Sequence, residues 1–173
     1  MEQKIYLLGL NHKTADVETR EKFALTGFNP FEHGLMVRNG PIQEALVLST
    51  CNRLEVICIS PDPFEEVKAL AIRAWAEFCA QDEKLLAAHI YGYTGLEAVE
   101  HLFSVAASLD SMVLGEPQIL GQLKDAYRKA VQEKTAGVII NRLLHKSFSA
   151  AKRIRTETAV SSSAVSISYA AVE

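Results

Sequence analysis

Residues 44–60 read Glu-Ala-Leu-Val-Leu-Ser-Thr-Cys-Asn-Arg-Leu-Glu-Val-Ile-Cys-Ile-Ser and carry the strongest strand signal in the chain. Two runs rich in Leu, Val and Ile flank four polar residues at positions 50–53. Apolar runs joined by a short polar segment are typical of a β-hairpin, and asparagine tolerates turn conformations. We therefore predict a hairpin with Cys51 near its tip and Cys58 within the core.

The segments around this hairpin form a pattern in which strands come early and helices late. Residues 4–10 and 89–93 are predicted strands, since each is short, apolar or aromatic, and bounded by polar or turn-forming residues. Helical spacing or helix-boundary residues mark 16–25, 31–37, 64–80, 95–110, 117–134, 137–156 and 164–173. The fold class indicated is α+β: a small, mostly antiparallel sheet of the ferredoxin-like type, covered by helices and followed by long C-terminal helices.

The composition is that of a globular domain. The chain has 173 residues, 49% of them hydrophobic, which is enough to bury a core. Its apolar runs are far shorter than the roughly 20 residues that span a bilayer, and its N-terminus lacks a signal-peptide pattern. The three cysteines have no metal-ligand spacing and are too sparse for a disulfide scaffold, so we expect a cytoplasmic protein with no metal site and no membrane association.

The net charge of −3 is unevenly distributed. Residues 136–173 carry two acidic side chains and five basic ones, namely Arg142, Lys146, Lys152, Arg153 and Arg155. A polyanion such as RNA is one partner that suits such a segment. A solvated helix face explains the same charges without a partner, and both interpretations stay open at this stage.

Cys51 is the sharpest candidate for chemistry. A thiolate attacks carbonyl carbons, and a reactive cysteine needs exposure and a nearby cation. A hairpin tip offers the exposure, and Arg53 lies two residues away. A cysteine in a turn can equally be incidental. Cys58 and Cys79 are expected to be buried as small hydrophobic side chains.

His101 is a second candidate. Helical spacing predicts an apolar stripe of Leu96, Val99, Phe103 and Ala106, which leaves His101 on the opposite face of its helix. The imidazole is then expected to face either water or a cleft. Facing a cleft, it would be suited to general acid–base work.

Polar residues at the start of the next helix form a third group. Glu116 lies just before Pro117 at a helix N-terminus, where a carboxylate is electrostatically favourable, so capping alone explains it. Gln118 and Gln122 are four residues apart and share one polar face. The alternative is that these groups grip a small polar ligand. His12 is attributed to turn chemistry at the end of the first strand.

Together these residues resemble a known family. The matching motifs are Gly9-Leu-Asn-His-Lys-Thr-Ala15, Arg20-Glu21, Ser49-Thr-Cys-Asn-Arg-Leu-Glu55, His101-Leu-Phe103 and Leu109-Asp-Ser-Met-Val-Leu-Gly-Glu-Pro-Gln-Ile-Leu-Gly-Gln122. The combination is similar to glutamyl-tRNA reductase across essentially the whole chain. Asp16 stands where the family often has proline, a departure in a turn, away from the chemistry that the resemblance implies.

The resemblance implies an NADPH-dependent reduction of glutamyl-tRNA to glutamate-1-semialdehyde with release of tRNA, which opens the five-carbon route to tetrapyrroles. Cys51 is then the nucleophile that forms a thioester, and His101 is important for activity. Arg53 is expected to hold a substrate carboxylate and Glu116 the ammonium. The implied substrate-binding positions are Thr50, Cys51, Asn52, Arg53, Ser111, Glu116, Pro117, Gln118 and Gln122.

The resemblance also implies a division of the chain. Residues 1–158 correspond to the catalytic, tRNA-binding domain, and residues 159–173 to a linker and the first helix of an NADPH-binding domain. Dimerisation in the family uses a later domain, and the aldehyde passes to glutamate-1-semialdehyde aminotransferase. No G-x-G-x-x-G motif is present in the sequence, so we expect only the acyl-transfer, or esterase, half of the reaction here.

Two other classes of protein fit the residues without the resemblance. A non-catalytic α+β module that binds RNA or an amino acid predicts that Cys51 can be replaced without loss. A thiol-redox protein predicts a resolving thiol, yet the sequence has no C-x-x-C motif and Cys58 lies within a strand pattern.

Overall fold

The computed structural model describes residues 2–161 and has the α+β fold that the sequence predicts. Its strands are β1 (Lys4–Asn11), β2 (Glu44–Ser49), β3 (Arg53–Ser60) and β4 (Tyr91–Thr94), and they form one sheet in the order β2-β3-β1-β4. All neighbouring strands are antiparallel. The predicted hairpin is the β2–β3 pair, and the strand order is that of a ferredoxin-like sheet.

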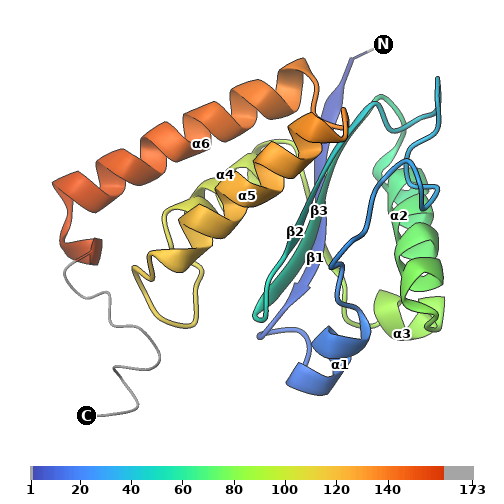
Figure 1. Cartoon of the computed structure of the whole chain (residues 1–173), viewed down its shortest axis with the longest axis horizontal. Helices are drawn as coiled ribbons and strands as arrows, with labels where there is room; N and C mark the ends of the chain where they lie inside the picture. The colour runs from blue at the N-terminus through green and yellow to red at the C-terminus, as the bar shows by residue number, and fades with distance from the viewer. Residues whose placement is uncertain (1, 162–173) are drawn as a thin grey trace.

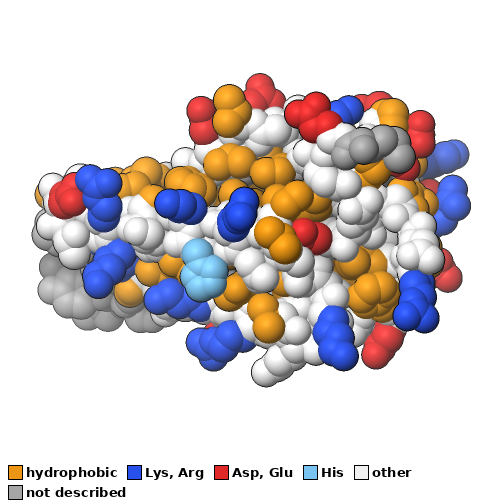
Figure 2. Space-filling view, turned by 90° about the horizontal axis from the view of Figure 1, so that it is seen from above, with side chains coloured by type: hydrophobic (Ala, Val, Ile, Leu, Met, Phe, Trp, Pro, Cys, Tyr) orange, Lys and Arg blue, Asp and Glu red, His pale blue; other side chains and the backbone are white. Residues whose placement is uncertain are grey.

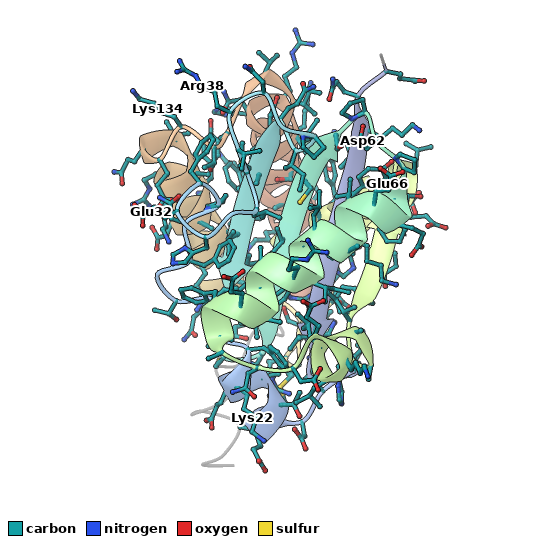
Figure 3. The ribbon with its side chains drawn as sticks, turned by 90° about the vertical axis from the view of Figure 1, so that its right-hand side faces the viewer. Lys22, Glu32, Arg38, Asp62, Glu66 and Lys134 are labelled. Carbon is teal, nitrogen blue, oxygen red and sulfur yellow. The ribbon has the colours of Figure 1, made fainter. Side chains whose placement is uncertain are left out.

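Helices cover both faces of the sheet (Figure 1). On one face lie α2 (Phe64–Cys79), which crosses the strands in Figure 3, and the short α3 (Glu83–Ala87). On the other lie α4 (Leu96–Ala106), α5 (Gln118–Gln132) and α6 (Val138–Glu157), the last followed by a 3-10 turn at Ala159–Ser161. The short α1 (Val17–Lys22) lies near the β2–β3 turn. Among the described residues no helix combines the length and apolar character needed to cross a membrane.

Side chains alternate between two cores, as strand geometry requires. The face toward α2 presents one set of buried apolar residues, which includes Tyr6, Leu8, Leu10, Leu54, Val56 and Cys58. The face toward α4, α5 and α6 presents the other, which includes Leu7, Leu46, Leu48, Ile57 and Ile59. By the same alternation Arg53 and Glu55 lie on this second face, so its apolar row gives way to charge toward the hairpin turn.

Three helix predictions differ from the structure at their boundaries. Helix α1 begins after Asp16, whose carboxylate accepts a hydrogen bond from the Thr19 N–H at 2.8 Å, but it ends at Lys22 rather than near residue 25. Residues 31–37 form turns rather than a helix. Helix α4 ends at Ala106 rather than near 110, and Ser108 just beyond has a φ of 62°. The predicted helix at 164–173 lies outside the described residues.

The predicted buried face of α4 is only partly correct: Ala106 is buried and Val99 and Phe103 are partly buried against the core, but Leu96 is not. Ala98, Leu102 and Val105 are buried against the sheet, whereas Leu96 is 79% exposed. Both stripes have helical spacing and apolar residues, and the smaller side chain of Ala98 favours a close approach of the helix to the strands. The correction turns His101 toward the sheet, because it lies three residues beyond Ala98 on the same side of the helix.

Glu44 fastens α6 to the sheet. The first N–H groups of a helix lack partners within it, and Gly137 before α6 has no side chain to cap them. The Glu44 carboxylate accepts hydrogen bonds from the N–H groups of Gly137 at 3.0 Å, Ile139 at 3.0 Å and Ile140 at 2.7 Å. This places a negative charge at the positive end of the helix dipole, so edge strand β2 fixes where α6 begins.

The variant Glu44→Ala should therefore lower the free energy of unfolding by about 1–3 kcal/mol, since three N–H groups lose their acceptor. Urea denaturation followed by circular dichroism measures this. Glu100→Ala, at an exposed position on α4, is the matched control and should change stability by less than about 0.5 kcal/mol. A Glu44→Ala protein as stable as wild type would contradict the capping role.

Candidate active site

The tip of the β2–β3 hairpin is held by hydrogen bonds from three directions. Within it, the Thr50 N–H donates to the Arg53 carbonyl at 2.8 Å. From the end of β1, the His12 N–H donates to the Asn52 carbonyl at 3.2 Å. From α1, the buried Arg20 donates through Nε to the Cys51 carbonyl at 3.1 Å. The backbone that carries the Cys51 thiol is therefore fixed by its neighbours.

Cys51 is the exposed thiol among the three cysteines, all of which lie in the described part of the chain. Cys58 is fully buried on β3, and burial raises its pKa to about 12. Burial also raises the pKa of the half-buried Cys79 to about 11. The predicted exposure of Cys51 and burial of Cys58 are confirmed, whereas Cys79 is only partly buried, and Cys51 is the thiol best placed to meet a substrate.

A narrow cleft of about 30 Å³ lies beside Cys51. It brings together most of the site positions that the sequence singled out: Thr50, Cys51, Asn52, Arg53, Ser111, Glu116, Gln118 and Gln122. The hairpin supplies the first four, and the α4–α5 loop and the first turns of α5 supply the rest. Pro117 and His101 are not among its lining residues, while His12, Met112 and Ile119 are.

Arg53 is the centre of a buried ion network behind this cleft. Its side chain is 3% exposed, and its NH1 donates to Glu55 Oε1 at 2.7 Å. Its NH2 donates to the Asp110 carboxylate at 2.8 Å and also to the Asp110 carbonyl. Although burial disfavours the charge, Glu55 and Asp110 raise the pKa of Arg53 above its ordinary value. The guanidinium thus joins β3 to the α4–α5 loop.

Glu55 is a fully buried carboxylate that gathers three side chains. It accepts hydrogen bonds from Arg53, from the Tyr91 hydroxyl at 2.5 Å and from His101 Nε2 at 2.6 Å. Burial alone would raise the pKa of Glu55, but these hydrogen bonds and the Arg53 charge hold it below its ordinary value. His101 also stacks on Tyr93, with ring centroids 4.7 Å apart. The imidazole therefore faces neither water nor the Cys51 cleft but the buried network.

Gly9 makes room for this carboxylate. It lies opposite Glu55 in the β1–β3 register, and a Cβ at position 9 would come within 2.6 Å of Glu55 Cγ and 2.9 Å of the Tyr91 hydroxyl oxygen. A side chain here would also meet the Leu54 backbone carbonyl at 2.8 Å. The network therefore needs glycine for its space rather than for an unusual backbone conformation.

The α4–α5 loop is anchored at both ends. Near its start, Asp110 bonds both Arg53 and Lys13 of the turn after β1. Near its end, the Ser108 hydroxyl donates to the Glu116 carbonyl at 2.5 Å, and the Gly115 N–H donates to the Ser108 carbonyl at 3.0 Å. These contacts fix Ser111 and Glu116 against the hairpin tip, which is what assembles the cleft.

His12 contributes a half-buried imidazole to the cleft wall. Its Nδ1 is buried and has no hydrogen-bond partner among the described residues. Burial first, and then the positive charges of Lys13 and Arg53, lower the pKa of His12 below its ordinary value. A neutral imidazole beside a thiol can accept a proton, so the cleft contains a base as well as a nucleophile.

Sequence reasoning missed Glu55, Asp110 and Tyr91 as site residues. It attributed His12 to turn chemistry and did not place it in the cleft. One signal was available: strand alternation puts Glu55 on the same face as Arg53, two residues earlier. Asp110 and Tyr91 reach the network only through tertiary contacts across about forty to eighty positions of sequence. Those contacts have no local sequence signature.

The fold and the site together define a small α+β domain with one accessible thiol above a polar cleft. The family model for the N-terminal domain of glutamyl-tRNAGlu reductase matches residues 8–158. The chain is 60% identical over 173 residues to the glutamyl-tRNA reductase of Nitratidesulfovibrio vulgaris strain DP4. It is 62% identical over 177 residues to that of Solidesulfovibrio magneticus. The chain thus belongs to the glutamyl-tRNA reductase family and corresponds to its N-terminal domain.

A solved structure agrees with this membership. The glutamyl-tRNA reductase from Methanopyrus kandleri matches 97% of this chain with a TM-score of 0.75 and 30% sequence identity. The match covers 38% of that chain, and the present chain spans 39% and 38% of the two curated relatives. The activity of a full-length reductase is therefore a proposal for this chain.

The variant Gly9→Ala should disrupt the network, because the added methyl group overlaps Glu55 and the Leu54 carbonyl. We expect a loss of about 1–3 kcal/mol in unfolding free energy, measured by urea denaturation. Gly121→Ala on α5 is the control, since a Cβ there meets no atom within 4 Å, and it should keep or raise stability. Equal stability of the two variants would contradict the prediction that a side chain at position 9 overlaps its neighbours.

The acid stability of the domain should depend on Glu55. Its folded pKa lies below its ordinary value of 4.5, so its contribution is present above that value and is lost as pH falls through the folded pKa. Between about pH 6 and pH 3, wild type should therefore lose more unfolding free energy than Glu55→Gln, which has no charge to titrate. Parallel losses in the two proteins, measured by urea denaturation at each pH, would show that Glu55 is not held ionised.

Proposed function

We propose that this domain binds glutamyl-tRNA and transfers the glutamyl group to Cys51 as a thioester, the first half of glutamyl-tRNA reduction. One observation carries the proposal: an exposed thiol stands over a cleft lined by eight of the expected substrate-binding positions. The identity of about 60% to named glutamyl-tRNA reductases supplies the substrate class.

The proposed chemical step uses groups that line the cleft. The Cys51 sulfur attacks the ester carbonyl carbon, so a C–S bond forms while the bond from that carbon to the ribose oxygen breaks. The thiol proton passes to a base, for which the neutral His12 imidazole on the cleft wall is suited, and the departing ribose oxygen takes up a proton. Water then releases glutamate from the thioester in the absence of a reductant.

The cleft offers opposite charges to the two ends of glutamate. Glu116 is suited to the ammonium, as expected from the sequence. Arg53 already donates to Glu55 and Asp110, so a two-bond grip on a substrate carboxylate requires Asp110 to give up one edge of the guanidinium. His101 contacts Arg53 NH1 at 3.3 Å, and we propose that it acts by positioning this arginine rather than by direct contact with the ester.

Residues 2–161, which the structure describes, do not fit a nicotinamide dinucleotide. The sheet is antiparallel, with no parallel β-α-β unit and no G-x-G-x-x-G segment in the sequence, the two features that cradle a pyrophosphate. We derive no step through NADPH here. For a full-length protein we propose that residues 1–158 form the catalytic domain and that residues 159–173 lead into a domain that binds NADPH. Homodimer formation through a later domain and delivery of the aldehyde to an aminotransferase belong to the same proposal.

The body of the tRNA is proposed to contact α6. Figure 2 shows Lys and Arg side chains spread along the arm of the molecule that this helix forms. Arg142 and Lys146 are exposed one turn apart on it. Arg153 and Arg155 already bond Glu157 and the Gly115 carbonyl, so they are less available for phosphate. The first turns of α6 therefore offer the better phosphate contacts.

Labelled glutamyl-tRNA tests the nucleophile. Mixed with wild type and without NADPH, it should transfer label to the protein and release glutamate slowly, whereas Cys51→Ser should do neither at more than about a hundredth of the wild-type rate. Cys79→Ser is the matched control and should react like wild type. If Cys51→Ser and wild type both bind tRNA and neither removes glutamate, the domain is a binding module.

Charge reversal tests the α6 contact. The double variant Arg142→Glu/Lys146→Glu should weaken tRNA binding at least about tenfold and reduce the dependence of affinity on salt, because two phosphate contacts are lost. Arg73→Glu/Lys84→Glu, exposed on α2 and α3 beyond the other face of the sheet, changes the net charge equally and should have a much smaller effect. If both double variants weaken tRNA binding equally, the loss comes from the change in net charge and the proposed contact at α6 is contradicted.

A further inference from the structure

The surface around Cys51 is divided into two unequal compartments, and the cleft described above is the smaller one. A second hollow of about 380 Å³ lies on the other side of the hairpin tip, toward α1. Thr50, Cys51 and Gln122 line both, so the thiol stands at the boundary between them. Attack on an ester at this boundary places the acyl group on one side and the leaving group on the other.

The second hollow continues into a third, of about 330 Å³, between α5 and edge strand β2. The two share Thr26, Ser49 and Gln122, so they form one trough that leads away from Cys51. Leu25, Val47 and Leu48 give the far part of this trough an apolar wall, and Asp125 and Lys129 give it a polar rim. An apolar wall with a few polar groups at the rim is the usual character of a ligand site.

The edge of the sheet adds hydrogen-bonding groups to this trough. The Ala45 N–H points away from β3, since it donates to the Thr135 carbonyl at 2.9 Å. The N–H and C=O groups of residues two apart on a strand point to the same side. Those of Val47 therefore also point away from β3, on the side where α5 lies. Val47 therefore offers both a donor and an acceptor beside an apolar surface, a combination that suits the edge and face of a nucleobase.

We propose that this trough, from Cys51 past Thr26 to Lys129, holds the 3′-terminal nucleotide of the tRNA during acyl transfer. The inference rests on the function proposed above, in which the substrate is an ester of a terminal ribose. The narrow, polar compartment, which must open beyond its present volume of about 30 Å³, takes the glutamyl group, and the larger, more apolar one takes the nucleoside that leaves. Of the two, only the trough has room for a nucleoside. Lys129 lies at its far end, where its Nζ donates to the Phe28 carbonyl at 2.9 Å and lies 3.6 Å from Glu133, so it meets the preceding phosphate by exchanging one of these contacts.

Two substrates that share the acyl group but differ in the leaving group test the proposal. Glutamyl-tRNA carries the terminal nucleotide, and glutamate α-ethyl ester does not. Thr26→Trp, at an exposed position on the trough, should slow Cys51-dependent release of glutamate from the tRNA at least tenfold and leave the ethyl ester rate within twofold of wild type. Asp125→Trp, from the opposite wall on α5, should act in the same way.

Glu32→Trp is the control, since Glu32, labelled in Figure 3, is exposed in the loop before β2 and is not among the residues that line the trough. It should leave both rates unchanged. Wild-type rates with the tRNA in both trough variants would overturn the proposal, as would an equal loss with both substrates, which indicates a disturbed hairpin tip. Failure of the proposed function is separate: wild type would then show no Cys51-dependent reaction with glutamyl-tRNA.

Discussion

The ion pair of Arg53 with Glu55, both almost fully buried, is the interaction on which the site depends. Placing two charges in a protein interior is expensive, so the pair depends on partners, although Glu55 Oε2 is buried with no hydrogen-bond partner among the described residues. Asp110, Tyr91 and His101 are those partners. Because they come from the α4–α5 loop, β4 and α4, satisfying the charges brings these three elements to the hairpin.

Because buried charges need partners, the rigid, buried part of the site lies apart from the exposed thiol. The charged groups face inward from β3, above Gly9, where the sheet and α4 exclude water. The thiol two residues earlier lies in the turn, outside the sheet, and remains exposed. A nucleophile needs access to its substrate, whereas the groups that position it need burial. The turn of the β2–β3 hairpin exposes Cys51, and strand β3 buries Arg53 two residues later.

Much of the fold was predictable because its signals are local. Apolar runs and polar turns gave the hairpin, and helical spacing gave α2, α5 and α6 within one or two residues at each end. The prediction for α4 had the right helix but placed the centre of its buried face wrongly, since packing of Ala98 against the sheet turns Leu96 outward. The short α1 and the turns at 31–37 depend on how that segment packs over the α2 core, which no local pattern encodes.

The site was predictable in its reactive residues and less so in their support. Motif resemblance located Cys51 and most of the cleft. Asp110 and Tyr91 contact Arg53 and Glu55 only in the folded chain, and the burial of Glu55 depends on Gly9 in a strand more than forty positions earlier. The resemblance to reductases therefore identified most of the groups that line the cleft, and the structure identified the buried charges that hold those groups in place.

The Arg53–Asp110 contact positions the α4–α5 loop against Cys51. Single-turnover transfer of glutamate from glutamyl-tRNA to Cys51 in the variant Asp110→Asn tests it most directly. The account predicts at least a tenfold slower transfer, with tRNA affinity within about threefold of wild type, because the cleft is disarranged while the α6 surface is not. Transfer at the wild-type rate would contradict it.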